Sequence, residues 1–451
     1  MPKRHLKILF YAAVLALFCY YGTNRYAGTL CHIMRVVQGQ SLEACDPRDL
    51  FDHALQGMMR SIDENSSYIP PKNYEELNET LSQEFGGLGI YVAMAENKQN
   101  PVIRFAYPDS PAAKAGVQAG DGIVSVDGES VANRSLDEIT RTLRGPVGTT
   151  VILGLKRGNQ TLNLSMVRDK IHVETVEGLI RRPDGTWDYS VPGNPGLIFL
   201  RLTSFGEKTY EEMYAVLSKL PEETRGLILD LRDNSGGLLD TAIRICDLFV
   251  DRGILVTTRG REGEVIQEFP ATAYTLWPDL PVAVLINGGS ASASEILAAC
   301  LQDHAQQGEL KAICVGERSY GKGTVQQLID LGYLPGDLAG SDDASQTRIP
   351  PLWKRVWSPP PRGALRLTVA SYWRPNGKNI HRFAEDTDKD TWGVVPNPGF
   401  VVPFHPDKAY RQQVRDRHCG TLKPEEISRI VPSDPQLQKA VEWIGSTTPA
   451  K

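Results

Sequence analysis

Residues 287–295 form a cluster of small residues and serines that carries the clearest chemical signal in the chain. An apolar run at 281–286 predicts a buried strand before the cluster, and the spacing of Ile296, Leu297 and Leu301 predicts the inward face of a helix after it. A serine at such a strand-to-helix turn can stand exposed beside the unpaired N–H groups that begin the helix. The segment therefore favours a serine nucleophile for acyl transfer.

A lysine that could serve this serine as a base lies in the segment 321–326. Lys322 comes after the next predicted strand, residues 312–315. Serine and lysine form a complete nucleophile–base pair that needs no histidine. Because a free lysine titrates at about pH 10.4, Lys322 must be held neutral to accept a proton, and burial favours the neutral form. Together these residues predict a protease.

The stretches that surround this pair support a closer comparison. They resemble the C-terminal processing peptidases, also called tail-specific proteases, from about residue 45 to about residue 445. Five stretches carry the resemblance, at residues 110–128, 226–237, 290–295, 321–326 and 365–377. The resemblance implies an α/β crotonase-like peptidase core with an inserted β-rich PDZ domain. It also implies a serine endopeptidase that selects its substrates by their C-terminal tails.

The resemblance gives catalytic roles to three side chains. Ser292, the middle one of three serines, is implied as the nucleophile, Lys322 as the base and Gln326 as an orienting glutamine. Ser290 is then expected in the turn, and Ser294 at the helix N-cap or in the first turn. If the segment after Lys322 is helical, Lys322 and Gln326 share one face of the helix.

Backbone N–H groups are expected to hold the oxyanion. One donor is Ala293, which follows the nucleophile as in other acyl-transfer sites. The second is expected from the glycine turn at 235–237, where Gly237 is preferred but Gly236 remains open. Asp303 matches an acidic position of some family members, and we expect it to be structural.

A peptide-binding loop is predicted near the start of the inserted domain. Gly87, Leu88, Gly89 and Ile90 are expected to point backbone N–H groups at the terminal carboxylate of a peptide, which would add as a strand. A capping box from Ser135 to Glu138 predicts a helix that forms the other wall of the groove.

The remaining pattern divides the chain into regions. Residues 26–80 are predicted to be helical, residues 81–169 to form the PDZ domain and residues 170–451 to form the peptidase core, where apolar strands alternate with helices. A Pro-rich insertion at 335–362 interrupts the core, and a lid or substrate-rim role is a hypothesis for it.

The first 25 residues resemble an export signal. Basic residues precede an uncharged apolar run at 8–21, and we expect an uncleaved signal anchor that leaves the body in the periplasm or cell envelope. A cleaved signal and a secreted protein are the second choice. Cys31 and Cys45 would then lie in an oxidising compartment, where they could pair.

Composition excludes several other classes of protein. The chain of 451 residues has a net charge of −5, which argues against a nucleic-acid surface. The scattered histidines and the lack of an HExxH motif predict no metal site, and no cofactor is expected. Residues 316–322 begin like a phosphate-binding loop, but Gly323 stands where the magnesium-binding serine or threonine should be.

Two alternative functions remain open at this point. One is a Ser-His-Asp hydrolase with His304 or His381 as the base, although no GxSxG elbow is present. The other is an inactive, membrane-anchored PDZ scaffold that binds protein C-termini. The expected partners are polypeptides with free C-terminal tails and, through the N-terminal segment, a membrane; a homo-oligomer is compatible with the sequence.

Overall fold

The computed structural model describes residues 25–94, 101–182, 184–331 and 363–447. The apolar run of the predicted signal anchor and the Pro-rich insertion at 335–362 lie outside the described residues. Among the helices in the described ranges, none is both long and apolar enough to cross a membrane. The chain divides into two units, residues 1–74 with 326–368, and residues 75–325 with 369–451.

The first unit contains most of the predicted helical region, up to residue 74. Its helices are α2 (Arg25–Gln40) and α3 (Pro47–Arg60), and Asp46 caps α3 by accepting from the Arg48 N–H at 2.7 Å. The sequence did not predict the strand β1 (Ser67–Ile69), which pairs antiparallel with the first residues of β20 (Ala364–Trp373). A strand of three residues is too short to show a period. Cys31 and Cys45 are both free thiols, so the possible disulfide is not formed.

Two paired strands, β2 (Glu84–Gly87) and β9 (Asp169–His172), connect the inserted domain to the rest of the chain, and we call them the stalk. Helix α4 (Pro71–Ser82) leads into β2, which pairs antiparallel with the outgoing strand β9. Between them lies a sheet in the order β3-β4-β5-β7-β8. Its strands are β3 (Ile90–Met94), β4 (Pro101–Ala106), β5 (Gly122–Val126), β7 (Thr150–Arg157) and β8 (Gln160–Val167), with β6 (Glu129–Ser130) beside β5.

Two helices complete this domain, α5 (Pro111–Lys114) and α6 (Leu136–Leu143). The predicted capping box is confirmed: the Glu138 N–H donates to Ser135 Oγ, and the Ser135 N–H donates to the Glu138 carboxylate. Ile139 and Leu143 of α6 are buried in the domain core.

The second sheet forms the centre of the α/β core. Its order is β10-β13-β14-β17-β18, and all neighbours except β10 and β13 are parallel. The strands are β10 (Val176–Glu177), β13 (Leu197–Leu202), β14 (Gly226–Asp230), β17 (Val282–Ile286) and β18 (Ala312–Gly316). Parallel strands covered on both faces read as continuous apolar runs, which explains why their sequences do not alternate.

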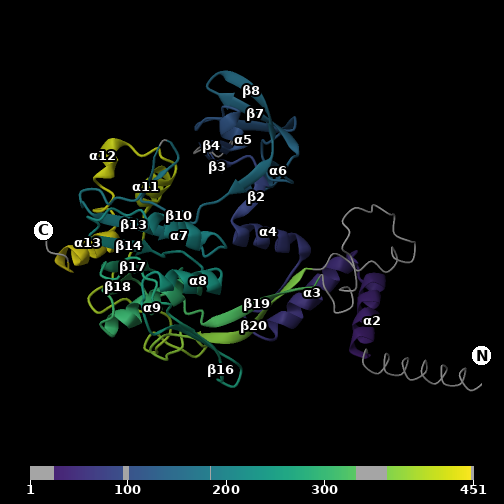
Figure 1. The fold of residues 1–451 in the computed structure, drawn as a ribbon. Coiled ribbons are helices and arrows are strands. Elements are labelled where there is room, and N and C mark those ends of the chain that lie inside the picture. The colour runs from purple at the N-terminus through teal and green to yellow at the C-terminus, as the bar shows by residue number, and fades with distance from the viewer. Residues whose placement is uncertain (1–24, 95–100, 183, 332–362, 448–451) are drawn as a thin grey trace, which may run out of the picture. The chain divides into compact units, whose positions relative to one another are not determined.

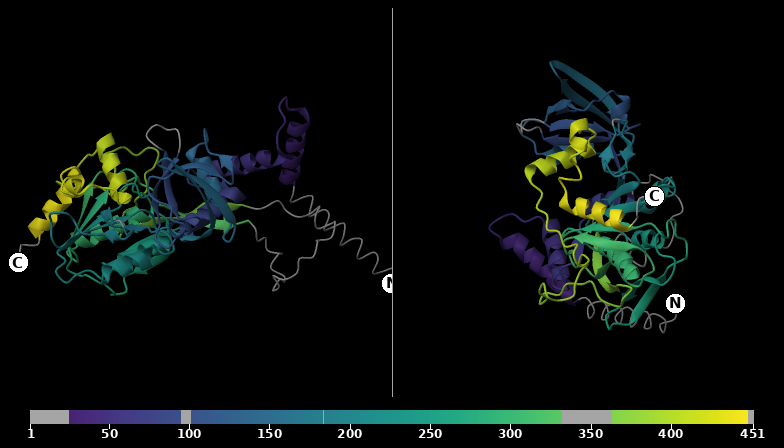
Figure 2. Two further views of the ribbon diagram at one scale, coloured as in Figure 1. Left: turned by 90° about the horizontal axis from the view of Figure 1, so that it is seen from above. Right: turned by 90° about the vertical axis from the view of Figure 1, so that its left-hand side faces the viewer.

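Helices cover both faces of this sheet. Leu227 and Leu229 pack with α7 (Thr209–Leu217), α8 (Leu239–Asp247) and α9 (Ala293–Gln306), whereas Ile228 points to the opposite face and packs with α13 (Pro435–Thr447). Figure 1 shows α7, α8 and α9 beside this sheet, and Figure 2 shows α13 at the yellow end of the colour scale. Because the strands are parallel, β14, β17 and β18 end at one edge of the sheet, where active sites of α/β proteins form.

The other elements flank this core. A hairpin joins β11 (Ile180–Arg181) to β12 (Trp187–Asp188), and β15 (Ile254–Arg259) pairs with β16 (Val265–Pro270) and with the last residues of β20. Strand β19 (Thr324–Asp330) pairs with β20, and α11 (Lys408–His418) and α12 (Pro424–Ile427) precede α13.

Candidate active site

Ser292 has a strained backbone at the turn between β17 and α9. Its φ of 57° and ψ of −116° lie in a region that non-glycine residues rarely adopt. Such strain persists where surrounding contacts hold it. Here the turn after β14 does so, because the Asn234 carbonyl accepts from the Ala291 N–H at 3.0 Å and from Ser294 Oγ at 2.8 Å. The sequence did not reveal this strain.

Hydrogen bonding distinguishes the three candidate serines. Ser290 and Ser294 are fully buried, and their hydroxyls donate to the carbonyls of Leu231 and Asn234, respectively. Both therefore have structural roles in the turn and first helical turn, as the sequence indicated. The Ser292 hydroxyl instead contacts the Tyr372 hydroxyl.

The buried carboxylate of Glu295 joins the serine turn to the lysine loop. It accepts from the backbone N–H groups of Ser292 (2.9 Å), Gly321 (2.7 Å) and Lys322 (2.8 Å), and from Ser319 Oγ (2.5 Å). Burial raises the pKa of Glu295 above its usual value, but these four donors favour the charged form. Glu295 appeared in the sequence only as the end of a motif, since its partners come from a distant loop.

Tyr372 is a further component of the site, which the sequence placed only within the resembling stretch 365–377. Its hydroxyl donates to the Lys322 carbonyl and also contacts the Ser292 hydroxyl. Burial, together with the negative charge of Glu295, raises the pKa of Tyr372, so the phenol stays neutral. Lys322 itself is half-buried in the loop between β18 and β19. One tyrosine therefore links the serine side chain to the backbone of the lysine.

The helical placement considered for Gln326 is wrong. Residues 324–330 form β19, and Lys322 lies in the loop before it, so the two residues do not share a helical face. β-Branched residues such as Thr324 and Val325 favour strands, and this was the available signal. Gln326 falls in the first unit, where its amide lies 3.5 Å from Thr368 Oγ1.

Two backbone N–H groups near Ser292 are available for an oxyanion. Ala293 begins α9 and Gly237 precedes α8; within the described stretches, neither N–H donates a hydrogen bond. The Gly236 N–H, in contrast, donates to Asn234 Oδ1 at 2.9 Å. A Cβ added to Gly236 would lie 2.8 Å from Ser292 Cβ and 2.9 Å from the Ala293 nitrogen. Gly236 therefore borders the space that an oxyanion would occupy.

Neither of the alternative histidines contacts Ser292 through a hydrogen bond in the described part of the chain. His304 binds Glu309 at 2.5 Å and the Ile254 carbonyl at 3.1 Å. A helix rises about 1.5 Å per residue, which places His304 about 18 Å along α9 from Ser292. Burial lowers the pKa of His304, but hydrogen bonds with Cys300 and Glu309 outweigh this and raise the pKa to about 9. His304 is therefore too distant and too readily protonated to be the base.

Two other side chains considered from the sequence have clear surroundings. The His381 ring stacks edge-on against Phe383, with centroids 4.9 Å apart, and its backbone packs against Gly323. Asp303 accepts from Arg374 at 2.5 Å and from the Asn376 side chain at 2.9 Å. These contacts agree with the structural role expected for Asp303.

The inserted domain has an open edge beside the predicted peptide-binding loop. Strand β3 ends the sheet order, and α6 packs near it. Gly89 has a φ of 70°, and the N–H groups of Leu88 and Gly89 donate to no acceptor in the residues that the structure describes. A cavity of about 440 Å³ lies along this edge. Its lining includes Gly87, Leu88, Gly89, Ile90, Leu143 and Arg144.

No metal-binding cluster of three or more His, Cys, Asp or Glu side chains occurs in the described ranges. The geometry instead centres on a serine hydroxyl, a nearby lysine loop and two unpaired backbone N–H groups. This combination suits nucleophilic attack on a carbonyl group and stabilisation of the resulting oxyanion.

Comparison with known proteins agrees with this chemistry. Residues 196–390 match peptidase family S41, and residues 102–157 match the PDZ domain. The carboxy-terminal-processing protease of Bartonella bacilliformis is 38% identical over 357 residues, which cover 77% of this chain and 71% of that protein. The chain belongs to peptidase family S41. It is therefore a serine protease with a PDZ domain.

One further curated relative and one solved structure are similar to this S41 protease. A probable CtpA-like serine protease of Staphylococcus haemolyticus is 34% identical over 378 residues, which cover 83% of this chain and 66% of the relative. Among solved structures, the photosystem II D1 C-terminal processing protease shares 24% identity, with a TM-score of 0.42, over 87% of this chain and 98% of that one.

Proposed function

We propose that this S41 protease is an endopeptidase that cuts exported or cell-envelope proteins, selects them by their C-terminal tails and uses Ser292 with Lys322. The main observation in support is the Glu295 carboxylate, which accepts from the N–H groups of both residues. One buried side chain thereby sets the distance between the serine turn and the lysine loop.

In the proposed mechanism, neutral Lys322 takes the proton from Ser292 as Oγ attacks the carbonyl carbon of the peptide bond. The N–H groups of Ala293 and Gly237 hold the oxyanion of the tetrahedral intermediate. The ammonium of Lys322 then protonates the leaving amine, and an acyl-enzyme forms on Ser292. Lys322 next activates water to hydrolyse the ester. We assign Gln326 to the orientation of Lys322.

Labelling and cleavage together test this proposal. The full-length protein is treated with a fluorophosphonate probe, and its products from unfolded polypeptides are mapped by mass spectrometry. We expect modification at Ser292 and cuts inside the chains. A protein that is labelled at no serine and cleaves nothing would instead be an inactive scaffold.

Tyr372→Phe should lower kcat about tenfold to a hundredfold with little change in KM. The hydroxyl contacts Ser292 and the Lys322 carbonyl, so its loss frees both to move from their reactive geometry. Steady-state kinetics on one peptide measures this split. Unchanged kcat would show that the tyrosine only fills space.

Tail recognition by the PDZ domain should depend on the free carboxylate. The unpaired N–H groups of Leu88 and Gly89 suit that group, and the open edge of β3 can accept an added strand. Peptides with apolar C-termini should bind at least about tenfold more tightly than their amidated copies, since each such charged hydrogen bond is strong. Fluorescence anisotropy compares the two, and equal affinities would remove the tail-sensing role.

We also assign the site of action to the outer side of a membrane. The apolar N-terminal run with its basic flank supports an uncleaved anchor, and a cleaved signal is the alternative. Fractionation of cells that express the full chain, followed by N-terminal sequencing, separates the two.

A further inference from the structure

Gln83 occupies an unusual position at the base of the PDZ stalk. It lies between α4 and β2 with a φ of 58°, and only 2% of its surface is exposed. Its Nε2 donates to Thr175 Oγ1 at 2.9 Å and to the Glu212 carboxylate at 2.8 Å. Its Oε1 accepts from the Lys208 N–H at 2.7 Å. Its backbone carbonyl accepts from the Val173 N–H at 2.8 Å.

These contacts join three separate segments: the incoming strand β2, the chain after the outgoing strand β9, and the loop before α7. A side-chain amide can donate to a carboxylate through its nitrogen while its oxygen accepts from a backbone N–H. A strained φ persists where its surroundings over-determine it, and such positions cluster at functional sites. Gln83 therefore merits a role beyond filling space.

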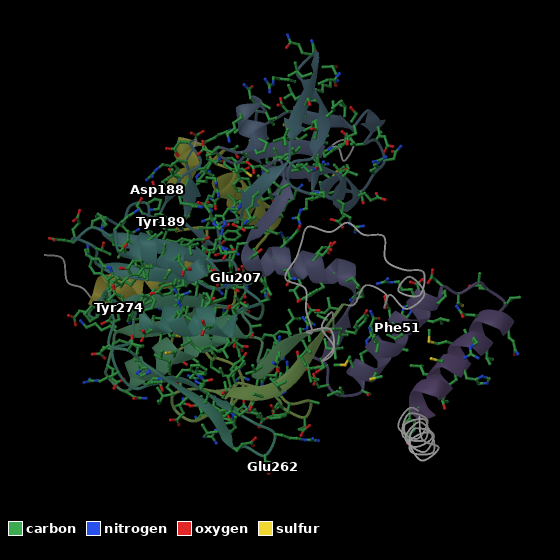
Figure 3. The ribbon with its side chains drawn as sticks, turned by 45° about the vertical axis from the view of Figure 1, so that its right-hand side comes forward. Phe51, Asp188, Tyr189, Glu207, Glu262 and Tyr274 are labelled. Carbon is green, nitrogen blue, oxygen red and sulfur yellow. The ribbon has the colours of Figure 1, made fainter. Side chains whose placement is uncertain are left out.

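The loop before α7 packs directly on Gln83. A Cβ added to Gly206 would lie 2.5 Å from Gln83 Oε1 and 2.6 Å from its Cγ. Gly206 is also held by Thr209, which accepts from its N–H at 2.9 Å, and by Thr241, which donates to its carbonyl at 3.0 Å. The neighbouring Glu207 N–H donates to the Leu81 carbonyl at the end of α4. Figure 3 shows Glu207 beside the end of this helix.

The same loop sets the backbone around Gly237. The buried Phe205 donates its N–H to the Gly236 carbonyl at 3.0 Å and accepts from the Leu238 N–H at 2.7 Å. These two hydrogen bonds bracket Gly237, and a Cβ there would lie 2.2 Å from the Phe205 carbonyl oxygen. The direction of the Gly237 N–H thus follows the position of Phe205, one residue from Gly206.

We infer that Gln83 is a positioning residue for the oxyanion turn. It clamps the stalk of the PDZ domain to the loop 205–209, which in turn orients the Gly237 N–H. The inference rests on the proposed function, in which that N–H stabilises the oxyanion. It goes beyond that function by making the stalk of the tail-binding domain and the oxyanion donor parts of one hydrogen-bonded unit. Disturbing Gln83 should therefore change the chemical step, not the binding of substrate.

Gln83→Ala tests this inference in the full-length protein with an amidated peptide substrate, which lacks the tail carboxylate. We expect kcat to fall about tenfold to a hundredfold, with KM changed by less than about twofold. A peptide aldehyde forms a tetrahedral adduct whose oxygen needs the same donors, so its affinity should fall by a similar factor. If Gln83 only stabilised the fold, the fall in kcat and the fall in affinity for the aldehyde would not be of similar size.

Gly206→Ala provides a second route to the same effect, because its methyl group would displace Gln83. The matched control is Gln302→Ala, another buried glutamine, which contacts Val395 and Asn397. It should change the melting temperature as Gln83→Ala does but keep kcat within about threefold. The double variant Gln83→Ala, Gly206→Ala should lose no more kcat than Gly206→Ala alone. In the double variant the methyl group of residue 206 no longer meets the Gln83 side chain.

Two outcomes would overturn the inference. One is a Gln83→Ala protein that is folded and retains kcat and affinity for the aldehyde. The other is a Gly206→Ala protein, used where Gln83→Ala does not fold, with the same retention. A wild-type protein that neither cleaves the peptide nor binds the aldehyde would instead contradict the proposed function.

Discussion

Replacing Lys322 with arginine is expected to abolish peptide hydrolysis as completely as replacing Ser292 with alanine, by about 10⁴-fold or more in kcat. Arginine keeps the positive charge but cannot lose its proton at neutral pH, so it cannot accept one from Ser292. The backbone N–H of residue 322 would still donate to Glu295, which leaves the loop in place. Peptide hydrolysis followed over hours in quenched samples measures the loss of kcat. The melting temperature of each variant shows whether it is still folded.

The double variant Ser292→Ala, Lys322→Arg should be no worse than either single variant, because each change disables the same pair. His381→Gln is the matched control, because it removes the histidine that would be the base in a Ser-His-Asp mechanism. This variant should retain most of the wild-type kcat. Substantial activity in Lys322→Arg, or its collapse in His381→Gln, would contradict the serine–lysine mechanism.

Gly236→Ala should lower kcat by about 10²–10³-fold, the cost of losing one oxyanion donor. The added methyl group would lie 2.8 Å from Ser292 Cβ and 2.9 Å from the Ala293 nitrogen, closer than real contacts allow. It would also sit in a backbone with a φ of 102°, which favours glycine. Both effects displace the Ala293 N–H from the reacting carbonyl.

A second glycine separates these two effects. Gly308 follows α9 with a φ of 78°, and a Cβ there would meet nothing within 4 Å. Gly308→Ala should therefore lower the melting temperature through backbone strain while kcat stays near the wild-type value. Kinetics on one peptide and thermal unfolding of both variants give the comparison. Equal losses of kcat would mean that strain alone, not intrusion at the serine, explains the effect.

The sequence predicted those parts of the fold that depend on local patterns. The helix expected after the serine cluster is α9, and the buried runs before Ser292 and Lys322 are β17 and β18. Periodicity and small-residue turns are properties of neighbouring residues, so one chain suffices to read them. The choice among three serines, in contrast, came from a resemblance, and the hydrogen bonds of Ser290 and Ser294 now give it a physical basis.

The parts that were missed depend on residues far apart in the chain. Glu295 gathers donors from the loop at 319–322, and Tyr372 reaches Ser292 from another strand. Neither contact appears in the hydrophobic periodicity of the sequence, because its partners lie far apart in the chain. The helical face considered as a condition for Lys322 and Gln326 does not exist, because Thr324 and Val325 favour the strand that the structure has there.

Because the two strands of the stalk are antiparallel neighbours, the inserted domain can be removed as one unit. Gly87 on β2 lies opposite Asp169 on β9, so the chain leaves and re-enters the core at one place. A two-residue turn such as Asn-Gly can join paired strands at that point, and it would preserve the register of Glu84 with His172. The peptidase core could thus exchange one recognition module for another of different specificity without a change in its own connectivity.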